Sequence, residues 1–158
     1  MPEPLPARDG QGIPLPERGA WLRRGISRNG GPLVEDREVV WLQAGPYFAD
    51  SRGFAGVTSF DGSRVQFHHL EGEPGEDTGT FRREGADLIE WGTNTDGSTF
   101  LEVWTPLPAA DGDTGSWTGA GAGAGAGAGP GAGAGYRVVR VGRHVVYVDS
   151  HGGRYWRT

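Results

Sequence analysis

The stretch VVWLQAGPYFADSRGFAGVTSF, residues 39–60, decides the fold of this chain. It is the most apolar and aromatic part of the sequence, and such residues favour strands over turns or loops. Gly45-Pro46 bends the chain within it, and Asp61-Gly62 directly after it is a strong hairpin signal. It therefore predicts three short antiparallel strands, near residues 39–43, 47–50 and 54–60.

The same alternation of apolar runs and turn residues continues through most of the chain, at intervals of roughly 10–12 residues. Further strands are predicted near residues 21–26, 64–70, 77–83, 88–93, 100–105, 136–141, 144–149 and 154–157. No helical period of useful length interrupts them. We therefore expect an all-β protein, a single antiparallel meander of about 8–10 strands closed into a barrel, since closure removes exposed strand edges.

Two segments differ in composition from this single domain. Residues 1–19 contain five prolines and are predicted to be a disordered leader. Residues 119–135 are a Gly/Ala repeat broken by Pro130, with no side chains suited to a core, and are predicted to be a disordered surface loop. The barrel domain is accordingly expected to span residues 20–158.

Composition excludes several kinds of function. The chain has no cysteine, so it has no disulfide, thiolate metal site or thiol nucleophile, and with no lysine it cannot form a lysine Schiff base. A net charge of -5 without a basic run argues against nucleic-acid binding, and no apolar run approaches membrane-spanning length. The N-terminus lacks the apolar core of a signal peptide, so we expect a cytoplasmic monomer.

Polar residues within apolar strands are the candidate site. Asp50 and Arg52 lie two residues apart and share a strand face. Glu90 and Glu102 are flanked by large apolar residues and would be neighbours if their strands pair around the turn at residues 94–97. Two adjacent histidines must point to opposite faces, so only one can join them. The predicted ligand-binding residues are Asp50, Arg52, His68, Glu90, Glu102, Trp41 and Trp104.

Two interpretations of this cluster remain open. The residues form a polar cluster inside the barrel, or Asp50 and Arg52 form a structural ion pair near a barrel corner while both glutamates face solvent. The four histidines show no metal-binding spacing, and neither a Gly-x-Ser-x-Gly motif nor a phosphate-binding loop is present. No metal, cofactor or catalytic residue is therefore predicted.

The pattern resembles the calycin group, which includes lipocalins and fatty-acid-binding proteins. Gly19-Ala20-Trp21 is similar to the Gly-x-Trp that opens the first lipocalin strand, and the resemblance implies that Arg154 or Arg157 lies over this tryptophan. The chain is also similar to an uncharacterised bacterial set of calycin-like barrels. The segments that carry this second similarity are residues 21–26, 39–52, 54–56, 85–92 and 100–104.

Three functions are compatible with a calycin-like barrel of this size. The leading hypothesis is a protein that binds a small, largely apolar or amphipathic molecule in the barrel mouth without catalysis. The second is a lyase, isomerase or hydrolase that uses lumenal carboxylates for proton transfer. The third is a structural or interaction module with a filled barrel.

Overall fold

The computed structural model describes residues 12–120 and 135–158, and every regular element in these ranges is a β-strand. The first eight strands are β1 (Arg18–Arg28), β2 (Val40–Ala44), β3 (Tyr47–Asp50), β4 (Phe54–Phe60), β5 (Val65–Gly72), β6 (Gly75–Glu84), β7 (Asp87–Thr93) and β8 (Thr99–Pro106). Each pairs antiparallel with the next, and β1 pairs with β8 to close a barrel. The all-β fold and the closed antiparallel meander predicted from the sequence are confirmed.

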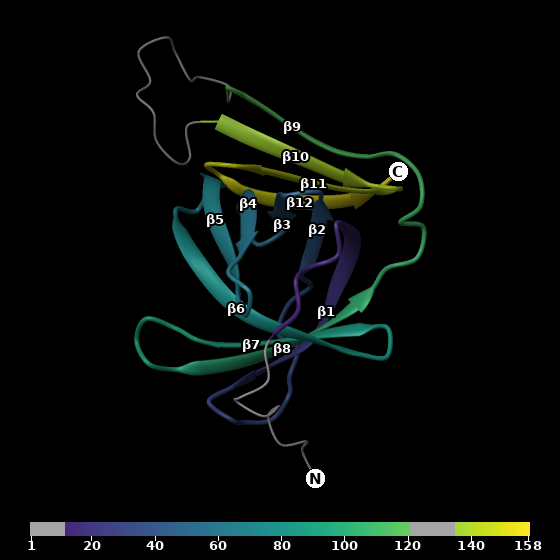
Figure 1. Ribbon diagram of the computed structural model, residues 1–158. Coiled ribbons are helices and arrows are strands. Elements are labelled where there is room, and N and C mark those ends of the chain that lie inside the picture. Colours follow the sequence, from purple (N-terminus) through teal and green to yellow (C-terminus); the bar gives the residue numbers. More distant parts are fainter. Residues whose placement is uncertain (1–11, 121–134) are drawn as a thin grey trace.

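The last four strands form a second sheet outside the barrel (Figure 1). They are β9 (Thr114–Ala120), β10 (Gly135–Val141), β11 (His144–Asp149) and β12 (Gly152–Arg157), in the order β12-β11-β10-β9. The sequence predicts the last three but not β9, whose small polar residues carry little strand signal. Because β1 and β8 already pair with each other, the barrel offers these strands no free edge.

An apolar layer joins this sheet to the outside of the barrel. The buried residues of the layer are Ala20, Val40, Leu42, Ala44, Ala49 and Ala55 of the barrel and Val139, Val141, Val146 and Val148 of the sheet. Arg137 of β10 crosses the layer, donating a hydrogen bond from Nε to Glu71 of β5 at 2.5 Å and lying over the Tyr47 ring. Small barrel residues opposite valines let the two layers approach closely.

A second core fills one end of the barrel interior. Trp21, Val39, Trp41, Phe48, Val65, Phe67, Phe81, Leu88 and Trp104 are all buried there. Ile13 and Leu15, which precede β1, pack against this core, and Ile13 N donates a hydrogen bond to Phe81 O. Residues of the predicted leader thus help close this end of the barrel, whereas residues 1–11 lie outside the described ranges.

The predicted Gly/Ala loop also lies largely outside the described ranges. Residues 121–134 are not described, but Gly119 and Ala120 belong to β9 and Gly135 to β10, and these two strands pair with each other. The connection therefore joins neighbouring strands of the outer sheet and does not interrupt the barrel.

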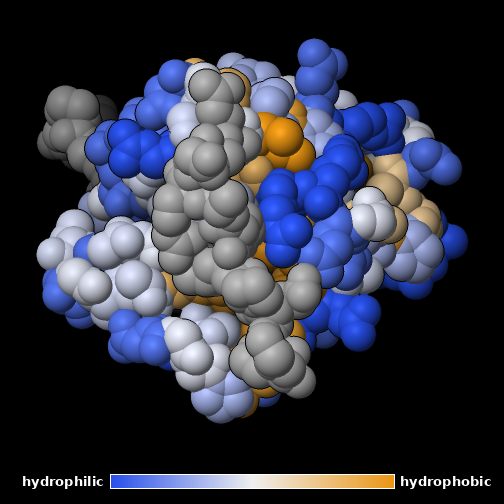
Figure 2. Space-filling view, turned by 60° about the horizontal axis from the view of Figure 1, so that its bottom comes forward, coloured by the Kyte–Doolittle hydropathy of each residue, from blue (hydrophilic) through white to orange (hydrophobic). Residues whose placement is uncertain are grey.

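Apolar side chains on the surface are scattered. Among the described residues, the large exposed ones are Leu33, Val34, Tyr47, Phe60, Leu70, Trp117 and Trp156, which apart from the neighbours Leu33 and Val34 come from different parts of the chain. On the face seen in Figure 2, hydrophilic residues dominate and hydrophobic ones show only in small areas. Isolated exposed apolar residues are normal for a folded protein, so the barrel interior is the more informative place to look for a site.

Candidate ligand-binding cavity

The end of the barrel opposite the filled core is hollow. A cavity of about 730 Å³ lies where β1, β5 and β7 end and β2, β6 and β8 begin. The turns at residues 73–74 and 94–98 contribute to its rim. This volume is within the range of roughly 300–1,000 Å³ that small-molecule sites occupy. The barrel is therefore packed at one end and has an open mouth at the other.

Aromatic rings form the floor of the cavity. Trp41 and Trp104 meet edge to face with their ring centroids 5.4 Å apart, and Phe48 and Phe67 do the same at 5.1 Å. All four line the cavity, and all four belong to the core that fills the other end of the barrel, called here the lumenal core. Offset and edge-on packing of this kind stabilises an aromatic cluster beyond simple burial. The floor thus presents a preformed apolar surface to anything that enters the mouth.

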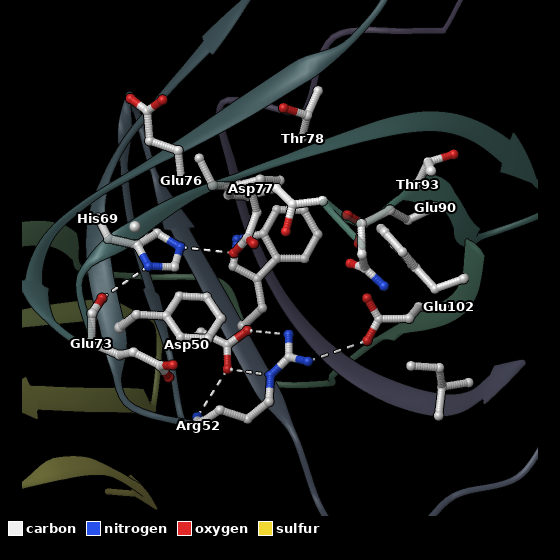
Figure 3. Close-up of a pocket in the computed structure, with 18 of the residues that line it drawn as sticks. Asp50, Arg52, His69, Glu73, Glu76, Asp77, Thr78, Glu90, Thr93 and Glu102 are labelled. Atoms are coloured by element: carbon white, nitrogen blue, oxygen red, sulfur yellow. Dashed lines mark hydrogen bonds and ion pairs between the residues drawn. The ribbon is translucent and has the colours of Figure 1, made fainter. Parts of the chain in front are cut away.

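A charged network forms one wall above this floor (Figure 3). Arg52 holds Asp50 with two hydrogen bonds, from Nε to Oδ1 at 3.0 Å and from Nη2 to Oδ2 at 2.8 Å. Its Nη1 points to Glu102 Oε2 at 3.4 Å. Burial disfavours the charged form of Arg52, but the charge and hydrogen bonds of Asp50 together with the charges of Glu102 and Glu90 outweigh it, so the pKa of Arg52 is raised.

Glu102 has a second cationic partner that the sequence analysis did not identify. Arg23 of β1 is almost fully buried and donates a hydrogen bond from Nη1 to Glu102 Oε2 at 3.0 Å. It also pairs with Glu35 at 2.7 Å, on the segment that precedes β2. Both guanidinium groups therefore converge on one carboxylate oxygen, and Glu102 is held between them.

Glu90 lies directly across the sheet from Glu102, because the two residues pair in the register of β7 and β8. Its exposed fraction is 7%, and Trp104 Nε1 donates a hydrogen bond to its Oε1 at 3.1 Å. Burial raises the pKa of Glu90 well above the ordinary value of a glutamate, and the negative charge of Glu102 raises it further. The Trp104 hydrogen bond and the Arg52 charge oppose this shift without cancelling it. The raised pKa favours the protonated form of Glu90, next to a Glu102 carboxyl group that is held by two arginines.

A glycine makes room for the Glu90 side chain. Gly79 of β6 lies beneath it, and a Cβ atom at this position would overlap Glu90 Oε2 and lie 2.9 Å from its Cδ. Any larger residue at position 79 would displace the carboxyl group. The placement of Glu90 in the lumen therefore depends on the neighbouring strand as well as on its own.

His69, rather than its neighbour, faces the cavity. Its Nε2 lies 2.8 Å from Asp77 Oδ2 and its Nδ1 lies 2.9 Å from the Glu73 carbonyl oxygen. Both partners are acceptors, so both ring nitrogens act as donors, which is the hydrogen-bonding pattern of a protonated imidazole. Burial opposes this charge, but the hydrogen bonds to Asp77 and to the Glu73 carbonyl, together with the negative charges of both residues, outweigh it, so the pKa of His69 is raised.

The predicted cluster is largely brought together. Six of the seven predicted site residues line the cavity: Asp50, Arg52, Glu90, Glu102, Trp41 and Trp104. The interpretation in which both glutamates face solvent is wrong, because both are buried. The choice of His68 as the lumenal histidine is also wrong. Its ring contacts Ser59 and Glu76 on the outer face of the barrel instead.

The predicted cap over Trp21 does not form as the resemblance implied. Trp21 stacks on Trp41 within the lumenal core, with ring centroids 6.0 Å apart. Arg154 lies over the Tyr147 ring in the outer sheet, and Arg157 is exposed at the end of β12. The closed end is packed instead by Ile13 and Leu15.

Comparisons with protein-family models, with curated proteins and with solved structures find no match to this chain. Within residues 12–120 and 135–158, no helix is long and apolar enough to cross a membrane. In the same ranges, no group of three or more histidine or carboxylate side chains is arranged to hold a metal ion. The cavity is therefore the feature of this chain that indicates a function.

Proposed function

We propose that this chain is a calycin-like binding protein that holds one small amphipathic molecule in the open half of its barrel. The apolar part of the molecule would rest on the floor formed by Trp41 and Trp104. Its polar part would reach the charged residues above, among them Arg52, Glu90 and Glu102. The floor suits the largely apolar ligand expected from the sequence. The charged walls favour a ligand that also carries a polar group.

The observation that carries this proposal is the hollow mouth. A cavity of about 730 Å³ sits over preformed aromatic packing and beside buried charges that are already paired. Burying charged groups at a cavity wall costs free energy that a simple apolar filling would avoid. A purely structural barrel needs neither a cavity nor buried charges. The third hypothesis, a structural or interaction module with a filled barrel, therefore fits these observations less well.

Native mass spectrometry of the full chain tests the proposal. Protein purified directly from a producing cell is compared with the same protein refolded from denaturant, which removes any retained small molecule. A defined extra mass on the first sample alone is expected. Adding the extracted molecule back should restore the mass shift and raise the midpoint of thermal unfolding. If no molecule is retained and an aromatic dye also fails to bind in the lumen, the binding function is wrong.

A proton-transfer enzyme is the second candidate, and one observation favours it. The raised pKa of Glu90 favours its protonated form directly across the sheet from Glu102, and acid–base enzymes use carboxyl pairs in which one pKa is raised in this way. Incubating the extracted molecule with fresh protein separates the two functions. A molecule recovered with unchanged mass and structure indicates binding alone. Conversion that is lost in the Glu90→Gln variant indicates catalysis.

A further inference from the structure

We infer that the polar group of the ligand is an organic cation, such as a protonated amine, whose positive charge lies against Glu90. This inference rests on the binding function proposed above and specifies the ligand class for that cavity. It follows from the charge balance of the walls, from the one buried acid that lacks a cationic partner, and from the aromatic floor.

The cavity wall carries more acid than base. The ionisable residues that line it are Asp50, Glu73, Glu76, Asp77, Glu90, Glu102, Arg28, Arg37, Arg52 and His69. The Glu76 carboxyl group turns outward to His68, so five acids and four bases remain. Their charges balance while Glu90 is protonated, and the wall gains one net negative charge when Glu90 ionises. A low-dielectric cavity focuses such a field on its interior. A positive charge beside Glu90 would compensate it.

Within the described residues, Glu90 is the deeply buried lumenal acid that has no basic partner. Asp50 is paired with Arg52, and Glu102 is paired with both Arg23 and Arg52. Glu90 accepts one hydrogen bond, from the Trp104 indole to Oε1, and no described donor reaches Oε2. Once Glu90 loses its proton, its Oε2 is therefore free to accept a strong hydrogen bond from a charged donor.

The groups that face Glu90 come from three other strands or turns. Glu102 on β8 and Asp77 on β6 contribute negative charge, and Arg52 after β3 contributes positive charge. Burial and these two negative groups together raise the pKa of Glu90 and favour its protonated form. A cation beside Glu90 would supply the missing positive charge. The carboxylic acid then becomes a carboxylate, and its proton is released to solvent.

The aromatic floor supports the same ligand class. Trp41, Trp104 and Phe67 line the cavity, and the face of an aromatic ring attracts a cation electrostatically. The Trp104 indole itself donates to Glu90, so the ring and the carboxyl group are adjacent. A matching ligand would place an aryl or alkyl group on the floor. A short linker would then carry its ammonium group to the adjacent Glu90 carboxyl group.

An anionic ligand fits these walls poorly. Arg52 already gives two of its hydrogen bonds to Asp50 and points a third nitrogen at Glu102. Arg28 is largely exposed at the rim and pairs with Asp36. An anion near Arg52 would therefore compete with its existing ion pairs and would also face Glu90.

Isothermal titration calorimetry with three matched probes tests the inference. The probes are 2-phenylethylamine, which is cationic at pH 7, 2-phenylethanol, which is neutral, and 3-phenylpropanoate, which is anionic. We expect the amine to bind at least about tenfold more tightly than the other two. We also expect amine binding to release about one proton, seen as different heats in phosphate and Tris buffers.

Variants identify the carboxyl group responsible. Glu90→Gln keeps an acceptor for the Trp104 indole but cannot ionise, so it should lose the preference for the amine and the proton release. Glu17→Gln makes the same change at an exposed position and should leave both unchanged. Gly79→Ala retains the acid but displaces it, and should also weaken amine binding.

The outcomes separate this inference from the function on which it rests. If the alcohol or the carboxylate binds as tightly as the amine, or if Glu90→Gln leaves amine binding intact, the cation inference is overturned while the binding function stands. If none of the three probes binds, the inference is likewise overturned. The binding function is then judged by the retained mass in native mass spectrometry, which requires none of these probes.

Discussion

Replacing Glu90 by glutamine should remove a pH-dependent loss of stability from the folded protein. Glutamine has nearly the same shape as a protonated glutamate, and its carbonyl oxygen can still accept the hydrogen bond from Trp104 Nε1. The substitution therefore changes one property, the ability of residue 90 to ionise. Stability then reports directly on whether Glu90 is a neutral acid in the folded chain.

The sign follows from the raised pKa of Glu90, whose causes are burial first and the charge of Glu102 second. Above about pH 4.5, the ordinary pKa of a glutamate, the unfolded chain releases this proton while the folded chain keeps it. The free energy of unfolding of the wild type therefore falls as pH rises, until the pH passes the folded pKa of Glu90. Below pH 4.5 both states hold the proton and the effect is absent.

The maximum slope is about 1.4 kcal/mol per pH unit for one proton. The variant should consequently gain up to about 2.7 kcal/mol relative to the wild type between pH 5.5 and pH 7.5. His69 also has a raised pKa, so it too makes stability fall as pH rises from near 6.5 through its folded pKa. It does so in both proteins, and the difference between the proteins therefore isolates Glu90.

Urea unfolding followed by tryptophan fluorescence, at half-unit steps from pH 5 to pH 8.5, measures this difference. The exposed Glu17→Gln variant serves as the matched control and should follow the wild type at every pH. A difference between Glu90→Gln and the wild type that stays constant with pH would refute the reasoning. It would mean that Glu90 is already ionised in the folded protein.

Two further predictions concern what holds the barrel together. Arg23→Met should lower the free energy of unfolding by roughly 3–5 kcal/mol, because it leaves part of the Glu102 charge buried without its partner. Arg28→Met, at a largely exposed ion pair, should change it by less than about 1 kcal/mol; equal losses in urea unfolding would contradict the assignment. Leu42→Ala should cost about 2–5 kcal/mol at the buried layer between barrel and outer sheet. The half-exposed Leu70→Ala should cost far less in the same assay, and a similar loss would argue against this layer.

The barrel could be predicted from the sequence because its signals are local. Alternating residues and turn pairs such as Asp61-Gly62 mark each hairpin, and strands joined by short turns pair with their neighbours. The same local signals do not distinguish the strands of the outer sheet from those of the barrel. Nothing near residues 136–157 shows that β1 and β8 have already closed the barrel, since that pairing joins opposite ends of the meander.

The parity of side chains explains which site residues were found and which were missed. Glu90 and Glu102 could be expected to lie side by side because one hairpin turn sets their register, but the sequence left open whether they face the lumen. His69 shares its face with Phe67 and Val65, so the same alternation could have favoured it over His68. Arg23 follows Trp21 by two residues, which places it on the lumenal face as well.

Other features of the site depend on contacts between distant parts of the chain. The pairing of Arg23 with Glu102 spans 79 residues, and the register of β1 with β8 shifts between Arg23 and Gly25. A bulge of this kind exchanges the faces of all later residues in the strand and leaves no clear mark in the sequence. The raised pKa of Glu90 likewise depends on burial by several strands at once.

A crystal structure of the full chain grown with 2-phenylethylamine would test the central claim most directly. The account predicts one molecule in the barrel mouth, with its ring on Trp41 and Trp104 and its ammonium within hydrogen-bond distance of Glu90. The Glu90→Gln variant grown in the same way should show an empty mouth or a reoriented molecule. Amine bound only on the outer surface, or a lumen closed by rearranged side chains, would contradict the account.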